Sequence, residues 1–248
     1  MVSSNDVTLP GPLSDHLEPQ RWEDCLFLDL GVRDYLESLN FQAKIVEKRK
    51  HHEIPDCLLF VEYDHTITLG RSGKQAHLLA SSKDLKEKNI RFYATDRGGD
   101  ITYHGPGQLI AYPILDLKRL RRDINWYLRT LEACIIATLK DCGIASRRIL
   151  GATGVWVEDE KIAAIGVRTS QWVTSHGIAL NVNTDLSYFD YIIACGIKGK
   201  GVTSIAKVLA SDSIDLCRIR ASFCHYFEVL FERSLRNDHK EGAPISWI

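Results

Sequence analysis

The sequence predicts an α/β (α+β) fold in which helices flank a mixed β-sheet. Short apolar runs of strand length alternate with stretches of helical periodicity along most of the chain. The acidic turn at residues 158–160 separates two apolar runs, which is typical of a hairpin. A length of 248 residues also allows most apolar surface to be buried without disulfide or metal cross-links. These observations together predict helices packed against a mixed sheet around one core.

The individual elements follow from periodicity and turn residues. Strands are expected at residues 26–31, 57–63, 91–104 (with a glycine turn inside), 109–117, 153–157, 161–168 and 176–186. Helices are expected at residues 35–50, 123–143 and 213–235. The second helix has the clearest signal, because its apolar stripe runs from Ile124 to Cys142 and Gly143 ends it.

Composition excludes several classes of protein. Residues 1–20 are rich in Pro, Ser and Asp and are expected to form a flexible tail. Lys and Arg number 31 against 32 Asp and Glu, so a general nucleic-acid binder is not expected. The chain shows no secretory signal and no apolar run of the roughly 20 residues that cross a membrane. We therefore expect a cytoplasmic protein.

Seven cysteines are present, and no two have Cys-x-x-Cys spacing. They are Cys25, Cys57, Cys134, Cys142, Cys195, Cys217 and Cys224. An odd number in a chain of this length argues against a disulfide framework, and the spacing argues against a zinc ribbon. Reduced thiols in a reducing compartment are the simpler interpretation.

Glycines frame a short polar strand at residues 97–108, Arg-Gly-Gly-Asp-Ile-Thr-Tyr-His-Gly-Pro-Gly-Gln. Glycine lets the backbone approach a ligand closely, so Thr102, Tyr103 and His104 could line a pocket. The same pattern is also typical of two turns around an ordinary strand. The segment is not a P-loop, because no Gly-Lys-Ser/Thr follows.

Cys195 and Lys161 are the candidates for nucleophile and base. Glycine follows Cys195 and leaves its thiol open, and the thiolate is the nucleophilic form of cysteine. On a regular strand Lys161 would share a face with Ala163, Ile165 and Val167, where an amine that has lost hydration can act as a base. Taken singly, a buried core cysteine and a surface lysine at a hairpin end are the commoner interpretations.

Two histidines and several basic runs have less specific signals. His104 and His176 could each be a general base, a hydrogen-bond anchor or a core histidine. No histidine pair has helical metal-binding spacing, so no metal site is predicted. The basic run at residues 118–122 is either a solvated face or a surface that steers an acidic partner.

Together these motifs resemble those of the lipoyl(octanoyl) transferases. RGGDITYHGPGQLIAYPILDL carries the family's Arg-Gly-Gly, Thr-Tyr-His, Gly-Gln and Tyr-Pro, and ITLGRSG resembles its Thr-Leu-Gly-Arg segment. TGVWVEDEKIAAIGVR resembles its Gly-Val-Trp-Val…Lys-Ile…Gly-Val-Arg block. TSHGIALNVNTDLSYFDYIIACGI resembles its His-Gly-Ala-Leu-Asn-Val…Cys-Gly block. The resemblance extends from about residue 25 to residue 209.

The resemblance implies a fold like that of biotin and lipoate protein ligases, with residues 21–248 forming a single catalytic domain. It implies octanoyl transfer from octanoyl-acyl carrier protein to a lysine of a lipoyl domain through an acyl-cysteine thioester, the first step of endogenous protein lipoylation. Cys195 would be the nucleophile and Lys161 its acid/base partner. The implied substrate-binding residues are Arg97, Gly98, Gly99, Asp100, Ile101, Thr102, Tyr103, His104, Ala164, Ile165, Gly166, Gly177, Ile178 and Ala179, with His176 and Arg71 in support.

The implied partners are octanoyl-acyl carrier protein as donor, and the lipoyl domains of 2-oxoacid dehydrogenase complexes and the glycine cleavage H protein as acceptors. Phosphopantetheine would arrive on the carrier, and neither ATP nor a metal would be needed by this monomer. Four alternatives remain: an ATP-dependent lipoate or biotin protein ligase of the same fold, an octanoyl amidotransferase, a non-catalytic module that binds carrier or lipoyl domains, and a hydrolase built on Cys195 and His176.

Overall fold

Two β-sheets of unequal size form the framework of the molecule. The computed structural model describes residues 23–194 and 200–237. The strands of the large sheet are, in spatial order, β12 (Arg233–Asn237), β1 (Glu23–Arg33), β2 (Asp56–Tyr63), β6 (Gln108–Ile114), β10 (Val173–Asn181), β9 (Glu160–Ser170), β8 (Ala152–Val157) and β7 (Arg147–Ile149). β11 (Gly201–Val202) also pairs with β9. β12, β1 and β2 are parallel to one another and β11 is parallel to β9, whereas all other neighbouring strands of this sheet pair antiparallel. The predicted mixed sheet is therefore confirmed.

The small sheet lies beside the large one and carries the glycine-rich segment. Its strands are β4 (Arg91–Ala94), β3 (Thr66–Leu69) and β5 (Ile101–His104), with β3 in the middle. β4 and β5 therefore pair with β3 and not with each other, and the connection at residues 95–100 passes from one edge of β3 to the other. The short helices are η1 (Gln75–His77), α2 (Ser82–Glu87), η2 (Leu186–Tyr191) and α4 (Ile205–Val208).

Three long helices cover the large sheet, and each begins directly after an aspartate. α1 (Tyr35–Lys50), α3 (Ile124–Asp141) and α5 (Leu216–Phe231) follow Asp34, Asp123 and Asp215. Each carboxylate accepts a hydrogen bond from backbone N–H groups of the first turn, which would otherwise lack partners. These local signals explain why α1 coincides with the predicted helix and α3 nearly does.

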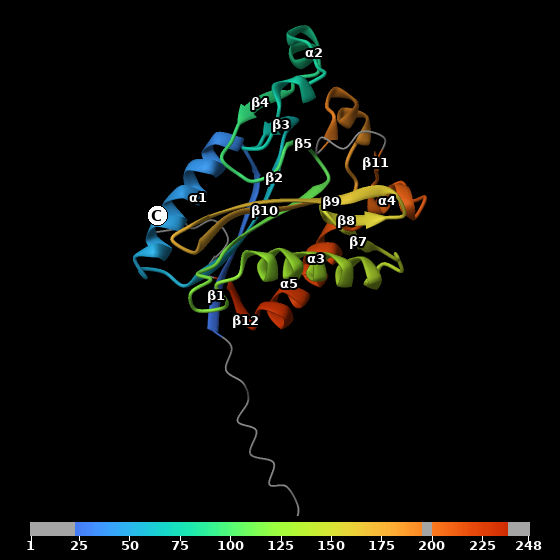
Figure 1. Ribbon diagram of the computed structural model, residues 1–248. Coiled ribbons are helices and arrows are strands. Elements are labelled where there is room, and N and C mark those ends of the chain that lie inside the picture. Colours follow the sequence, from blue (N-terminus) through green and yellow to red (C-terminus); the bar gives the residue numbers. More distant parts are fainter. Residues whose placement is uncertain (1–22, 195–199, 238–248) are drawn as a thin grey trace, which may run out of the picture.

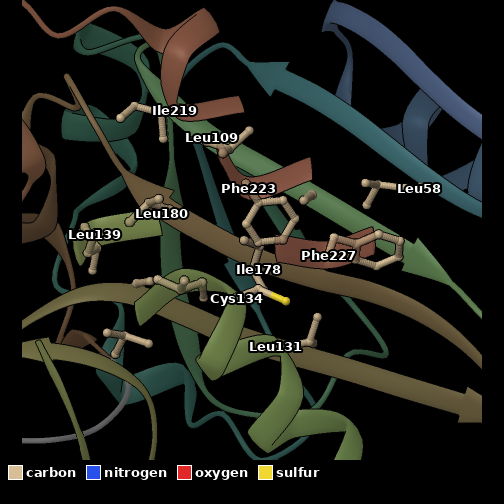
Figure 2. Packing of buried hydrophobic residues seen from close by; sticks show 14 of the residues in the cluster. Leu58, Leu109, Leu131, Cys134, Leu139, Ile178, Leu180, Ile219, Phe223 and Phe227 are labelled. Carbon is tan, nitrogen blue, oxygen red and sulfur yellow. The ribbon is translucent and has the colours of Figure 1, made fainter. Parts of the chain in front are cut away.

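The large sheet is buried on both faces, so successive residues of its strands alternate between two apolar clusters. Leu58 and Phe60 of β2 belong to the cluster that α3 and α5 cover, whereas Leu59 and Val61 belong to the cluster that α1 covers. Figure 1 shows this arrangement of the helices around the strands. Figure 2 shows part of the first cluster, to which α3, α5, β2, β6 and β10 contribute.

The predicted helix at residues 213–235 is wrong at its C-terminal end. α5 ends at Phe231, and Glu232 has a left-handed backbone with φ of 52°. The next residues form β12, which pairs in parallel with β1. Helical periodicity continues through this stretch of sequence, but the partner strand lies about 200 residues earlier and leaves no local signal.

A buried ion-pair cluster fixes β12 to the rest of the sheet. The Asp56 carboxylate accepts hydrogen bonds from Arg49 Nε at 2.7 Å and from Arg233 Nε at 2.8 Å. The backbone N–H of Asp116 also donates to it at 2.9 Å. All four residues are buried. The cluster thus joins the end of α1, the start of β2, the segment after β6 and the start of β12.

Replacing Asp56 with alanine is expected to lower the free energy of unfolding by about 3–5 kcal/mol, because two buried guanidinium groups would lose the carboxylate that they share and keep only the longer ion-pair contacts with Asp116 and Glu23. Urea unfolding followed by circular dichroism measures this change. Asp159→Ala is the matched control, since the Asp159 side chain is 72% exposed where it pairs with Lys200 and Arg147. Its unfolding midpoint should stay close to that of the unmodified protein. Equal effects of the two substitutions would contradict the structural importance of the cluster.

Candidate active site

A cavity of about 260 Å³ lies between the small sheet and the two central strands β9 and β10. The glycine-rich connection and β5 form one wall, and β9 and β10 form the opposite wall. The turn between β7 and β8 closes one side. The residues that line the cavity are Tyr35, Arg97, Gly99, Asp100, Ile101, Thr102, His104, Tyr112, Gly151, Ala152, Thr153, Lys161, Ala164, Ile165, Gly166, His176, Gly177, Ile178 and Ala179.

A β-bulge in β9 decides which side chains face this cavity. Val155 of β8 is opposite Ala163, but the next residue, Trp156, is opposite Lys161, so Ile162 is an extra residue. The bulge reverses the alternation of side chains along β9. Ile162 and Ala163 both pack into the cluster under α3 and α5, whereas Lys161 lines the cavity. The prediction that Lys161 shares a face of the strand with Ala163, Ile165 and Val167 is therefore wrong.

Lys161 is buried with its amine held by the neighbouring strand. Its side chain shows 7% relative exposure, and its Nζ donates to the backbone carbonyl of Thr153 at 3.1 Å. The amine also lies 4.8 Å from the centre of the Trp156 ring, a cation–π distance. Gly154 lets the β8 backbone lie close to β9, because a Cβ there would meet the carbonyl oxygen of Ala163 at 2.5 Å. Lys161 therefore has a defined position in the cavity wall.

A second, smaller cavity adjoins the first and shares Lys161, Thr102, Ala164 and Ala179 with it. Its other lining residues are Gln108, Trp156, Asn181, Phe189, Ala194, Lys200, Gly201 and Val202. Cys195 lies outside the described residues. The two residues that flank residues 195–199, Ala194 and Lys200, line this cavity. Val202 of β11 pairs with Lys161, and the Thr203 N–H donates to the Lys161 carbonyl at 3.0 Å. The described chain on both sides of residues 195–199 thus lines the cavity that Lys161 lines, and the chain after residue 199 also pairs with Lys161 directly.

Arg97 brings a positive charge to the opposite wall. Its Nη2 donates to the Thr68 carbonyl at 2.8 Å and its Nη1 to the Gly98 carbonyl at 3.1 Å. Gly166 of β9 must lack a side chain here, because a Cβ would lie 2.8 Å from the Gly98 carbonyl oxygen.

His104 lines the same cavity, and its ring Nδ1 lies at hydrogen-bond distance, 2.9 Å, from Gln108 Oε1. Burial and the charge of Arg97 lower the pKa of His104 to about 3, so its imidazole is neutral near pH 7.

His176 is held in a conformation that is rare for a residue with a side chain. Its φ is 56° within β10. Its backbone N–H donates to Gln42 Oε1 at 3.0 Å, and its Nε2 lies 2.8 Å from a carboxylate oxygen of Asp96. Burial lowers the pKa of His176, although the hydrogen bond with Asp96 opposes this shift. A neutral imidazole that donates to Asp96 is therefore expected near pH 7, with Arg168 pairing to the same carboxylate.

Comparisons with known proteins assign this arrangement to a family. Residues 34–228 match the family model of the lipoyl protein ligase A/B catalytic domain. An octanoyltransferase from Christiangramia forsetii is 48% identical over 224 residues, covering 84% of this chain and 96% of the relative. An octanoyltransferase from Solibacter usitatus is 49% identical over 209 residues, covering 84% and 94%. The chain belongs to the octanoyltransferase family.

Solved structures show that this octanoyltransferase-family chain has the fold of lipoate protein ligases, as predicted. Lipoate-protein ligase A bound with ATP has a TM-score of 0.68 and 15% identity, covering 88% of this chain and 89% of that one. The bi-partite lipoate protein ligase from Thermoplasma acidophilum has a TM-score of 0.67 and 16% identity, covering 88% and 87%.

None of the helices in the described part of the chain is long and apolar enough to span a membrane.

Three of the residues that the sequence suggested for the octanoyltransferase site do not line the cavity. Tyr103 alternates with Thr102 and His104 on β5, so its ring points to the other face and stacks with Tyr188 at 5.1 Å. Arg71 has an exposed side chain, and only its backbone N–H reaches the site segment, at the Arg97 carbonyl. Gly98 lies just behind the wall, with its N–H bonded to the Val167 carbonyl at 2.9 Å.

Several residues of the site were missed by sequence reasoning. Tyr35, Tyr112 and the turn at residues 151–153 line the cavity, and Asp96 supports His176. Asp96 directly precedes the Arg-Gly-Gly motif, so its position could have drawn notice. Tyr112 and Thr153 belong to the quoted Tyr-Pro and Thr-Gly-Val-Trp-Val motifs, so they too carried a signal. Tyr35 and residues 151–152 carry none, because they reach the site from α1 and the β7–β8 turn. The basic run at residues 118–122 follows β6, contributes no residue to either cavity, and includes Arg119, which pairs with Glu23.

Proposed function

We propose that the protein transfers an octanoyl group from octanoyl-acyl carrier protein to a lysine of a lipoyl domain, with Cys195 as nucleophile and Lys161 as acid and base. The observation that carries the proposal is the buried Lys161 amine in a cavity wall to which the chain before and after residues 195–199 also contributes. The octanoyltransferase relatives support this substrate class. Proteins with lipoyl domains, such as 2-oxoacid dehydrogenase complexes and the glycine cleavage H protein, are the proposed acceptors.

In the first half-reaction, the Lys161 amine takes the proton of the Cys195 thiol. The thiolate attacks the thioester carbonyl of the carrier-bound octanoyl group, and a new carbon–sulfur bond forms. The bond to the phosphopantetheine sulfur breaks, and the Lys161 ammonium returns the proton to that leaving thiolate. The product is octanoyl-Cys195, and the Lys161 amine can accept a proton again.

In the second half-reaction, the amine of the acceptor lysine attacks octanoyl-Cys195. Lys161 accepts a proton from this amine as the amide bond forms, and it then protonates the departing Cys195 thiolate. Because a thioester is already activated, the proposed reaction uses neither ATP nor a metal. The C8 chain would lie along Ala164, Gly166 and Ala179, whose small side chains leave room in the cavity.

Intact mass spectrometry tests the proposal. The protein is incubated with octanoyl-acyl carrier protein, without ATP, and the acylated position is located by digestion. We expect a gain of one octanoyl group on the Cys195 peptide, which disappears when a lipoyl domain is added. No covalent adduct would indicate a non-catalytic binding module. Octanoylation of the lipoyl domain only with ATP, from free octanoate, would indicate a ligase, and free octanoate released from the carrier would indicate a hydrolase.

A further inference from the structure

A buried carboxylate stands directly behind the cavity wall, on the side away from the small sheet. Glu132 of α3 is fully buried. One of its carboxylate oxygens, Oε2, accepts hydrogen bonds from Arg129 at 2.6 Å and from Arg148 at 2.9 Å. The other, Oε1, accepts from the backbone N–H of Gly154 at 3.1 Å. Two guanidinium groups thus pair with the buried charge through Oε2, while Oε1 is held by the Gly154 backbone.

The Gly154 N–H belongs to the same peptide group as the Thr153 carbonyl. That carbonyl accepts the hydrogen bond from Lys161 Nζ at 3.1 Å. A single peptide group therefore lies between Glu132 and Lys161, with its N–H donating to the carboxylate and its carbonyl accepting from the amine.

The arrangement has two physical consequences. An ionised acceptor makes a stronger hydrogen bond than a neutral one, so Glu132 fixes the orientation of this peptide group firmly. The bond also polarises the peptide and makes the Thr153 carbonyl a better acceptor for Lys161, because hydrogen bonds in series strengthen one another. Gly154, at φ of 120°, has a conformation that favours glycine, and the carboxylate helps to hold it there.

We propose that Glu132 is a positioning residue for Lys161, acting through the peptide group between Thr153 and Gly154. This inference rests on the proposed acid/base function of Lys161. Glu132 does not touch the cavity, and no substrate contact is assigned to it. Its role is to hold the amine at the depth and direction at which it exchanges a proton with the nucleophile.

The test is a double-mutant cycle on the rate of acyl-enzyme formation, measured in single turnovers by mass spectrometry. Glu132→Gln keeps the size of the side chain but replaces the ionised acceptor by a neutral one. Its acylation rate is expected to fall about fivefold to tenfold, with an unchanged KM for octanoyl-acyl carrier protein. In a Lys161→Ala background, the same substitution should change the residual rate by less than twofold, because the group that Glu132 positions is gone.

Arg148→Gln is the matched control. It removes one hydrogen bond to Oε2 but leaves the bond from Gly154 to Oε1, so its acylation rate should stay within twofold of the original. If Glu132→Gln slows the protein equally with and without Lys161, or raises only KM, Glu132 is merely structural and the inference fails. An unchanged rate in Glu132→Gln would overturn it as well.

Thermal unfolding shows whether each variant is folded. Should Glu132→Gln not fold, Glu132→Asp enters the same cycle, since its shorter side chain withdraws the charge from Gly154. The same two patterns of rates then decide the outcome. Failure of the proposed function is separately recognisable, because Lys161→Ala by itself would then leave the acylation rate unchanged.

Discussion

Replacing Cys195 with alanine is expected to abolish octanoyl transfer, with a loss of at least about 10⁴-fold in kcat, the scale seen when a nucleophile is removed. The acyl-enzyme cannot form without the sulfur, so both half-reactions disappear together. The protein should still bind octanoyl-acyl carrier protein, because the cavity walls come from β5, β9 and β10. The measurement is the rate of lipoyl-domain octanoylation, together with intact mass after incubation with the donor.

Cys217→Ala is the matched control for this experiment. Cys217 is an exposed free cysteine at the start of α5, outside both cavities. The variant should keep both the adduct and the full rate of transfer. An octanoyl adduct that persists at the original yield in Cys195→Ala would assign the nucleophile to another residue.

Replacing Lys161 with alanine is expected to slow both half-reactions by about 10²–10⁴-fold, the range for loss of a general acid–base group. Lys161 is the residue that takes a proton from the thiol and later from the acceptor amine, so neither step retains its proton carrier. The fold should persist, because the aliphatic part of Lys161 lies in the cavity wall and not in the clusters under the helices. Acyl-enzyme formation and its discharge are measured separately in single turnovers.

Two variants accompany Lys161→Ala. Lys207→Ala removes an exposed amine that pairs with Glu160, the residue next to Lys161, and it should leave both rates unchanged. Lys161→Arg carries a permanent positive charge that cannot give up its proton near neutral pH, and it should be nearly as slow as the alanine variant. Full activity in Lys161→Arg would show that the charge, and not proton transfer, is what the reaction needs.

Local signals in the sequence were sufficient to place the three long helices, apart from the end of α5, and most strands. The helices α1 and α3 follow capping aspartates, and α3 also carries a continuous apolar stripe, so their positions could be predicted closely. The end of α5 could not, because β12 depends on pairing with β1 and on the distant partner Asp56. Residues 91–104 read as a strand, a turn and a strand. Only the insertion of β3 between β4 and β5 shows how that segment is arranged.

The orientation of site residues depended on tertiary structure in the same way. Alternation along β5 could have separated Tyr103 from its neighbours, but the sequence does not say which face meets the cavity. The bulge at Ile162 arises from pairing between β8 and β9, and a count of residues along one strand cannot reveal it. Glu132 is even less visible, because its peptide partner lies 22 residues further along the chain.

The sequence alone determined the order of the motifs, the choice of Cys195 and Lys161 as candidate nucleophile and base, and the resemblance to a transferase family. These properties depend on residue type and spacing along one chain. Which face Lys161 presents, what holds its amine, and which strands enclose the cavity were decided by the tertiary structure. The physical reason is that a pocket is built by contacts between segments far apart in sequence, and such contacts impose register, bulges and buried charge pairs that no local pattern encodes.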